Sequence, residues 1–124
     1  MVARSTEHAT HGRHAVQIAF QPGEYAGFSM DRYLAASRTL SDWSGYHALE
    51  FDLYNPRASQ ERLFLNVQDR EGRAHREPLL VDGRAALHVS LPLAELNEQM
   101  DRSRIVEVGF SRVDAESPAI LYLD

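Results

Sequence analysis

Short stretches of the chain alternate strictly between apolar and polar residues, and the clearest of them lies between Ser41 and Asn66. In the sequence HALEFDLY, the apolar residues Leu49, Phe51 and Leu53 alternate with polar or amphipathic ones, and LFLNV repeats the pattern after an Asn-Pro turn. Successive side chains of a β-strand point to opposite faces of a sheet, so the pattern predicts two strands that each bury one face. The short loop between them predicts a β-hairpin.

The same alternation recurs along the chain and predicts eight strands. They cover His14–Phe20, Tyr25–Arg32, His47–Tyr54, Glu61–Asp69, Arg73–Val81, Arg84–Leu91, Arg104–Val113 and Ala119–Asp124. Residues typical of turns separate these segments, and Asp82-Gly83 is the strongest two-residue turn signal among them. Many short strands at close spacing are typical of an antiparallel sandwich, so we predict an all-β jelly roll of two sheets.

Each predicted strand offers one apolar row to the core. The rows include Val16, Ile18 and Phe20; Leu63, Leu65 and Val67; Leu87, Val89 and Leu91; and Val106, Val108 and Phe110. Helical structure is limited to one or two short turns. The segment LAELNEQMDRS after Pro92 has apolar residues at helical spacing, whereas Tyr33–Leu40 fits a helical turn or a loop equally well.

Length and composition define how many cores the chain can form. The 124 residues are 44% hydrophobic, which suffices for one core, so we expect residues 1–124 to form a single domain. The last strand pattern runs to the final residue, which leads us to expect a domain excised from a longer protein.

Charge and residue usage exclude several classes of function. The formal net charge is −5, and the thirteen basic residues are all arginines scattered along the chain, which argues against a nucleic-acid partner. No apolar run approaches the ~20 residues that span a bilayer, so we expect no membrane partner. The absence of cysteine excludes disulfides, thiolate metal sites and cysteine nucleophiles. His8, His11 and His14 would suit zinc, but no carboxylate or thiolate accompanies them, and a solvated N-terminal segment is the simpler interpretation.

Several sequence motifs, in order, carry a family resemblance. The stretch DWSGYHALEFDLYNP, a later strand that ends in Gln-Asp, the segment LPLAEL and the final ILYLD resemble the galactose-binding-like jelly-roll domains. This class includes non-catalytic carbohydrate-binding modules and accessory domains of bacterial glycoside hydrolases and related secreted proteins. The likeness covers roughly Glu7 to Asp124 and implies a carbohydrate or a neighbouring protein domain as partner, and an extracellular or periplasmic location.

The resemblance also implies a place for a structural calcium ion. In that class the segment before the first strand and the last strand often lie together and hold calcium through oxygen ligands. The positions that match here are Glu7, Thr10, Gly12 and Asp124.

Sugar-binding surfaces combine aromatic rings, which stack on apolar sugar faces, with amides and carboxylates that bind hydroxyls. The outward residues of the predicted central hairpin fit this inventory, and His88 and Glu107 would extend the same face. Loops at a sandwich end offer a second candidate with Tyr25, Phe28 and Tyr33. The candidate ligand-binding residues are Glu50, Asp52, Tyr54, Asn66, Gln68, Tyr25 and Tyr33.

Two alternatives to sugar binding follow from the same residues. Glu50 and Asp52 stand about 6.5 to 7 Å apart on one strand, near the spacing of glycosidase carboxylates, but a hydrolase needs a closed cleft, and we expect no enzymatic activity. Trp43 and Tyr46 could stack on a sugar, although an indole at this position more often plugs the end of a sandwich. The chain could also serve only as a spacer or docking domain, and a large exposed apolar patch would favour that function.

Overall fold

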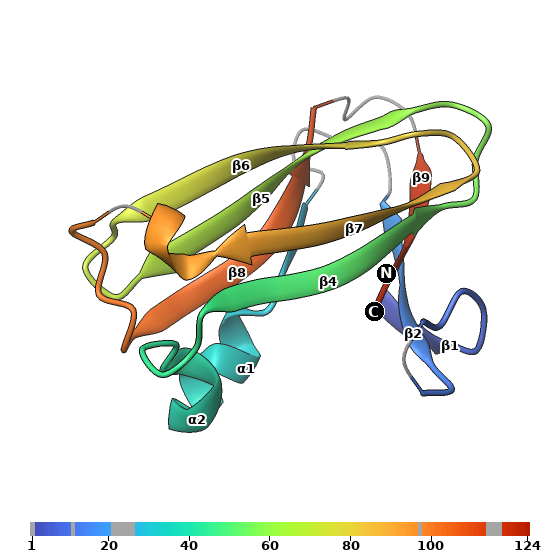
Figure 1. The fold of residues 1–124 in the computed structure, drawn as a ribbon. Helices are drawn as coiled ribbons and strands as arrows, with labels where there is room; N and C mark the ends of the chain where they lie inside the picture. Colours follow the sequence, from blue (N-terminus) through green and yellow to red (C-terminus); the bar gives the residue numbers. More distant parts are fainter. Residues whose placement is uncertain (1, 11, 21–26, 97, 114–117) are drawn as a thin grey trace.

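The computed structural model describes residues 2–10, 12–20, 27–96, 98–113 and 118–124. In this part of the chain, nine strands form two antiparallel sheets that face each other across one core (Figure 1). The five-stranded sheet has the order β1 (Val2–Ser5), β2 (Ala15–Phe20), β9 (Ala119–Leu123), β4 (Ala48–Asn55) and β7 (Ala85–Pro92). The four-stranded sheet has the order β3 (Gly27–Ser29), β8 (Ile105–Arg112), β5 (Glu61–Asp69) and β6 (Ala74–Val81). The predicted all-β, two-sheet antiparallel sandwich is confirmed.

The observed strands match the predicted ones closely. One additional strand, β1, has only four residues, too few for a period to be recognised in the sequence, and its pairing with β2 defines it. The predicted strand Tyr25–Arg32 is described only from Gly27, and β3 ends at Ser29. Directly after it, the Met30 N–H donates to the carbonyl of Val108 (2.9 Å) and the chain turns into a helix.

Among the described residues, helical structure is confined to three short segments, one more than predicted. α1 (Asp31–Ala36) and α2 (Arg38–Ser41) replace the ambiguous Tyr33–Leu40 stretch, and η1 (Leu93–Glu95) is a single 3-10 turn. The helix predicted after Pro92 is therefore wrong beyond that turn, since the backbone is already extended at Leu96. Leu93, Leu96 and Met100 are nevertheless buried, so their spacing reflects a loop packed on the core. None of the described helices has the length and apolar character to cross a membrane.

The chain crosses between the sheets where hairpins were predicted. β4 pairs with β7 and β9, whereas β5 pairs with β6 and β8, so the chain changes sheets after β4 and again after β6. The hairpin predicted from β4 and β5 is therefore wrong, and Asp82-Gly83 also connects two sheets (Figure 1). Alternation indicates which face of a strand is buried but not which strand lies beside it.

A buried asparagine joins the two crossover loops. Asn55, only 1% exposed, donates from Nδ2 to the carbonyl oxygens of Ser59 (2.8 Å), Val81 (3.3 Å) and Asp82 (3.3 Å). Its Oδ1 accepts from the N–H of Arg57 (3.1 Å). One side chain thereby satisfies backbone groups of both loops, and we call Asn55 with loops 56–60 and 82–84 the crossover clamp.

Glycine is required at one position of the crossover clamp. A Cβ atom on Gly83 would lie 2.0 Å from the carbonyl oxygen of Ala58, which is part of the backbone and cannot move aside cheaply. The close approach lets the Arg84 N–H donate to the carbonyl of Arg57 (2.8 Å). The two loops therefore pack backbone against backbone.

The core lies between the apolar rows of the two sheets. The most deeply buried side chains include Leu53, Leu63, Leu65, Val67, Val81 and Leu121. The register between β5 and β8 shifts by one residue at a bulge, since Gln68 pairs with Glu107 but Asp69 pairs with Ile105. Ile105 is therefore buried at the place predicted for Val106. Val108 and Phe110 keep the predicted inward orientation.

Two buried charges accompany the apolar core. Glu61 and Arg112 form a bidentate ion pair, with Nε to Oε1 at 2.6 Å and Nη2 to Oε2 at 3.3 Å. Both residues are buried at the end of the four-stranded sheet. Because the carboxylate and the guanidinium satisfy one another, removing either one alone leaves an uncompensated buried charge.

Asp69 fixes the loop that precedes β8. The carboxylate is buried and accepts hydrogen bonds from the N–H groups of Arg73 and Asp101, each at 2.8 Å. Burial raises the pKa of Asp69, but the backbone donors together outweigh it and hold the pKa below the usual value. The charged form of Asp69 therefore stabilises the folded state.

We expect Asn55→Ala to lower the free energy of unfolding by about 2–4 kcal/mol, because one buried and two partly buried backbone carbonyls lose a donor. Urea denaturation measures the change. Asn66→Ala is the matched control: its amide contacts only a side-chain hydroxyl of Ser111 on the outer surface, and we expect a loss within about 1 kcal/mol. Equal losses in the two variants would contradict the clamp.

We expect Asp69→Asn to destabilise the fold at neutral pH and to make little difference in acid. The folded pKa lies below the unfolded value of about 3.9, so the stabilisation is present above that pH and is lost as pH falls through the folded pKa. Unfolding curves of both proteins between pH 7 and pH 2 should converge at the acid end. A constant difference across that range would contradict the assignment.

Candidate functional site

The predicted carboxylates lie on the outer face of the five-stranded sheet. Asp52 of β4 stands opposite His88 of β7 and Glu50 opposite Ser90. The Nδ1 of His88 lies 2.7 Å from Asp52 Oδ1, and its Nε2 lies 3.9 Å from Glu50 Oε1. The side chains of Glu50 and His88 are 61% and 60% exposed, so they form an open, solvated row.

A segment near the N-terminus covers the aromatic part of that face. We call Glu7–Thr10 the N-terminal strap. The imidazole of His8 stacks on Tyr54, with ring centroids 3.7 Å apart, and lies tilted against Tyr122 at 4.7 Å. Tyr54, a predicted sugar-stacking residue, therefore already has a ring on one face.

The N-terminal strap is held by its own hydrogen bonds. Thr10 donates from Oγ1 to Asp52 (2.8 Å) and Asp124 (2.9 Å), and the hydroxyl of Tyr122 donates to Glu7 (2.5 Å). The bond to the Glu7 carboxylate raises the pKa of Tyr122, and burial raises it further. These contacts order a segment that the sequence alone presents as solvated.

The same contacts test the calcium site that the resemblance implies. Thr10 and Asp124 do meet, but the hydroxyl of Thr10 occupies Asp124 Oδ2, while Glu7 accepts from Tyr122. Gly12 lies in a turn with positive φ. Across the described residues, no three His, Cys, Asp or Glu side chains lie close enough to hold a metal ion. These contacts give no support for the implied calcium site.

The remaining strand candidates lie on the opposite side of the molecule. Asn66 and Gln68 belong to β5, so they face outward from the four-stranded sheet, and Glu107 lies opposite Gln68 there. The Nδ2 of Asn66 donates to Ser111 Oγ (3.0 Å), and the guanidinium of Arg76 covers the ring of Phe64 at 3.8 Å. The single binding surface predicted from a hairpin is therefore wrong: its two halves lie on different outer faces, because β4 and β5 belong to different sheets.

The ligand-binding candidates predicted in loops have side chains that the structure does not describe. Tyr25 lies outside the described residues. Tyr33 lies in α1 and Phe28 in β3, and their side chains also lie outside the described part.

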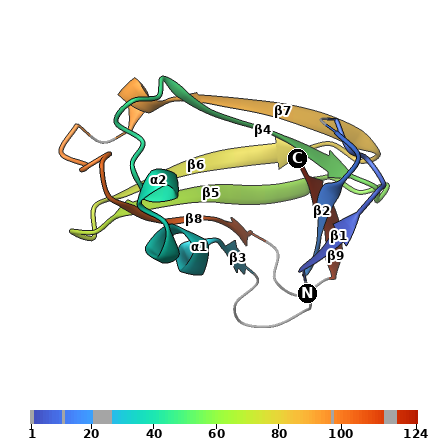
Figure 2. The ribbon, with the colours of Figure 1, turned by 90° about the horizontal axis from the view of Figure 1, so that it is seen from below.

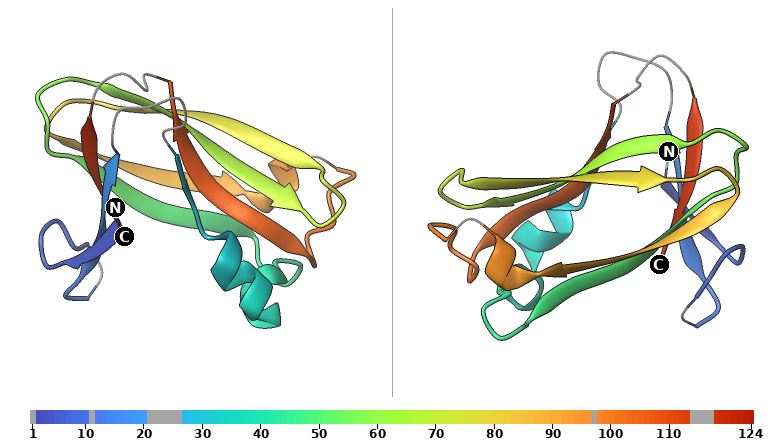
Figure 3. Two further views of the ribbon diagram at one scale, coloured as in Figure 1. Left: turned by 180° about the vertical axis from the view of Figure 1, so that it is seen from behind. Right: turned by 45° about the horizontal axis from the view of Figure 1, so that its top comes forward.

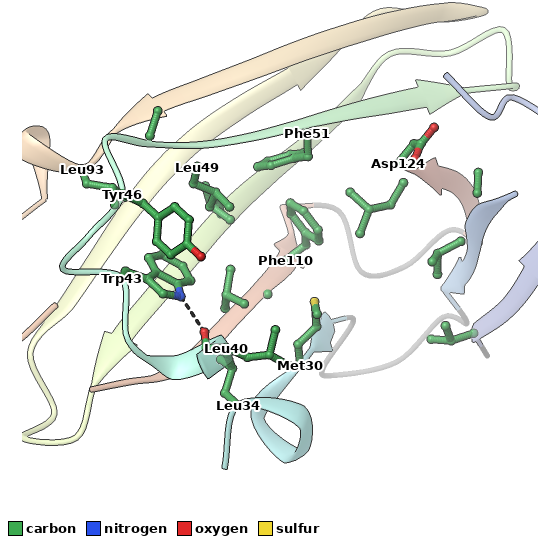
Figure 4. A pocket seen from close by; sticks show the side chains of 18 of the residues that line it. Met30, Leu34, Leu40, Trp43, Tyr46, Leu49, Phe51, Leu93, Phe110 and Asp124 are labelled. Atoms are coloured by element: carbon green, nitrogen blue, oxygen red, sulfur yellow. Dashed lines mark hydrogen bonds between the residues drawn. The ribbon is translucent and has the colours of Figure 1, made fainter. Parts of the chain in front are cut away.

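A cavity opens between the two sheets, beside the helices. It has a volume of about 750 Å³, and side chains from α1, α2, β4, β8 and the loop before β4 point into it (Figure 4). Figures 2 and 3 show α1 and α2 on one side of the long strands, set apart from β1, β2 and β9. Its lining includes Met30, Leu34, Leu40, Trp43, Tyr46, Leu49, Phe51, Leu93, Phe110 and Asp124.

Trp43 and Tyr46 come from one turn at the mouth of this cavity. The Tyr46 N–H donates to the carbonyl of Trp43 (3.1 Å), and the indole Nε1 of Trp43 donates to the carbonyl of Leu40 (2.8 Å), drawn in Figure 4. Trp43 is half-buried against the core, whereas Tyr46 is 64% exposed. Trp43 packs against the core, as predicted for an indole that closes the end of the sandwich. It also borders the cavity, which that structural role does not explain.

Among the described residues that line the cavity, His14, Thr39, Tyr46 and Asp124 carry polar side-chain groups besides the indole of Trp43. Figure 4 shows Asp124 on the far side of Phe51 from Tyr46. The Nδ1 of His14 lies 2.9 Å from Arg4 Nη2, which orients the imidazole. The sequence offered no signal for this group, because its members come from four separate segments.

The carboxylate pair is poorly placed for hydrolysis. Glu50 stands in solvent, and Asp52 accepts from Thr10 and contacts His88. A glycosidase acid needs enclosure to raise its pKa, and these two carboxylates share no enclosed cleft.

Comparison with solved structures identifies the fold. A family 11 carbohydrate-binding module from Clostridium thermocellum, solved with a β-1,3-1,4-mixed-linked tetrasaccharide, superposes with a TM-score of 0.64 at 12% identity. The match covers all of this chain and 79% of the module. A family 30 module of a cellulosomal cellulase from the same organism gives a TM-score of 0.63 at 17% identity, again over 100% and 79% of the two chains. The fold is that of carbohydrate-binding modules.

The same fold occurs within much longer enzymes. An exo-β-agarase matches 99% of this chain with a TM-score of 0.73 at 14% identity, and the match covers 20% of the agarase. The chain thus spans about a fifth of that enzyme's length. No protein-family model and no curated protein sequence matches the chain.

We expect Glu7→Gln to lower the pKa of Tyr122 towards its ordinary value of about 10, because the neighbouring carboxylate charge is removed. NMR titration of ¹³Cζ-labelled tyrosine reads each ring separately. An unchanged pKa of Tyr122 would contradict the strap geometry.

Proposed function

We propose that this chain is a non-catalytic carbohydrate-binding module whose glycan site is the cavity mouth formed by Trp43 and Tyr46. The exposed Tyr46 ring beside this cavity carries the proposal. The likeness to modules solved with or named for carbohydrate supports the choice of ligand class.

The accessibility of the aromatic rings favours this site over the outer faces, where other side chains already cover the rings. Among the aromatic side chains that the structure describes, only Tyr46 is exposed. His8 covers one face of Tyr54, and Arg76 covers Phe64. A sugar that stacks on those rings must first displace a partner, whereas at Tyr46 it displaces water.

The rim supplies groups that can orient a sugar. Thr39 and the hydroxyl of Tyr46, which line this part of the cavity, can each donate and accept a hydrogen bond. A ring for the apolar face and a few hydrogen-bonding groups are what weak glycan recognition requires. Glu50, Asp52, Asn66 and Gln68 remain candidates for a secondary contact on the outer faces.

We also propose that the 124 residues form one module of a longer secreted protein. The agarase match, which spans a fifth of that enzyme, supports an accessory position beside another domain. A second candidate function, docking of a neighbouring domain, is favoured by the exposed apolar side chains of Val2 and Leu40, which border the cavity from β1 and from α2.

Calorimetric titration against a glycan panel tests the proposal. The panel holds the mixed-linked glucan tetrasaccharide, cello-oligosaccharides and agarose oligosaccharides. We expect one of them to bind with a Kd near or below about 1 mM, and Tyr46→Ala to weaken it about fivefold to tenfold.

Tyr54→Ala is the matched control. It should reduce stability without changing glycan affinity, because its ring packs under His8. Loss of binding in Tyr54→Ala but not in Tyr46→Ala would move the site to the outer face. No binding of any panel member at millimolar concentration would exclude carbohydrate and leave docking.

A further inference from the structure

The interior of the cavity differs in chemistry from its mouth. Beyond the rim the walls are the apolar side chains of Leu34, Leu49, Phe51, Leu65, Leu93 and Phe110. A sugar ring placed among them would lose water from its hydroxyls and find no partner for them. The glycan of the proposed function can therefore occupy only the mouth.

A sugar bound at the mouth would fill only part of the cavity volume. Its volume of about 750 Å³ lies within the ~300–1,000 Å³ typical of small-molecule sites. An apolar cavity of about 150 Å³ already holds a benzene molecule. The interior therefore has room for a hydrocarbon chain in addition to a sugar at the rim.

We propose that the natural ligand is a glycan bearing an alkyl or acyl chain, with the sugar at Trp43 and Tyr46 and the chain inserted between the sheets. This inference rests on the proposed function, since it names the ligand class of the same site. Transfer of the chain from water to the apolar interior supplies the binding free energy that a single exposed ring cannot.

The mouth is built to admit such a chain. Leu40 of α2 is 51% exposed and lies at the rim, so an entering chain would pass an apolar side chain. Leu80 of β6 is equally exposed, at 49%, but faces outward from the four-stranded sheet. These two leucines form a matched pair for testing the route.

The single tryptophan makes the site directly observable. Trp43 is the only tryptophan of the chain and borders the cavity, so its fluorescence reports on this site alone. Methyl, hexyl and octyl β-D-glucoside, each below its micelle concentration, are the probes. We expect each added CH₂ to tighten binding about two- to fourfold, with a blue shift of the emission as water leaves the mouth.

Variants localise the effect. Leu40→Glu places a charge in the path of the chain and should remove most of the gain from hexyl to octyl, whereas Leu80→Glu should preserve it. Val108→Phe, which fills part of the cavity, should flatten the dependence on chain length. Because Leu40 and Leu80 are both exposed, folding is preserved in the decisive comparison.

The outcomes separate this inference from the proposed function. Equal affinity across the glucoside series, with retained binding of the oligosaccharide panel, overturns the chain site and leaves the glycan module intact. Binding of 1-octanol as tight as that of octyl glucoside removes the sugar from the ligand and overturns this inference, while the oligosaccharide panel still decides the proposed function. A dimer in sedimentation equilibrium that octyl glucoside dissociates identifies a second copy as the occupant and likewise overturns the proposal.

Discussion

The buried amide of Asn55 joins the two loops through which the chain passes between the sheets. It satisfies three carbonyl oxygens at the point where the chain passes from one sheet to the other in both directions. The close backbone approach at Gly83 leaves no room for a side chain at the same junction. β4 runs from this junction to the opposite end of the sandwich, where its first residues border the large cavity. One end of the sandwich is thus closed by hydrogen bonds, and the other is left open to solvent.

The alternation of side chains predicted the fold because it is a local property. The predicted ends of β4 and β5 lie within one or two residues of the observed ends, because apolar and polar residues alternate along each strand. Their pairing was not predicted correctly, because a loop of a few residues can lead to a neighbour in the same sheet or to the facing sheet. The amide of Asn55 stabilises the connection to the facing sheet, and its hydrogen-bond partners lie up to 27 residues away in the sequence. The displacement of Val106 by Ile105 likewise depends on a bulge that no periodicity reveals.

The candidate site was harder to predict for the same reason. Tyr54 has the sequence context of an exposed strand residue, yet His8, more than forty positions earlier, lies on its ring. Trp43 precedes a core strand, as a plug would, but the neighbouring cavity requires Leu34, Leu93 and Phe110 from three other segments. Residue type indicated the chemistry available to the chain, while the long-range contacts decided which rings remained accessible.

The order of strands at the edge of the five-stranded sheet has a mechanical consequence. β1 and β9 both pair with β2, so they run parallel to each other on its two sides, and Thr10 links the strap to Asp124. A tension applied between residues 2 and 124 would pull these strands lengthwise past β2 and load several ladder bonds together. That resistance lies apart from the helices and from Trp43. A module stretched between neighbours would therefore bear force along one edge, and because Val2, Val16 and Leu123 of these strands also line the cavity, that load would act directly on one wall of it.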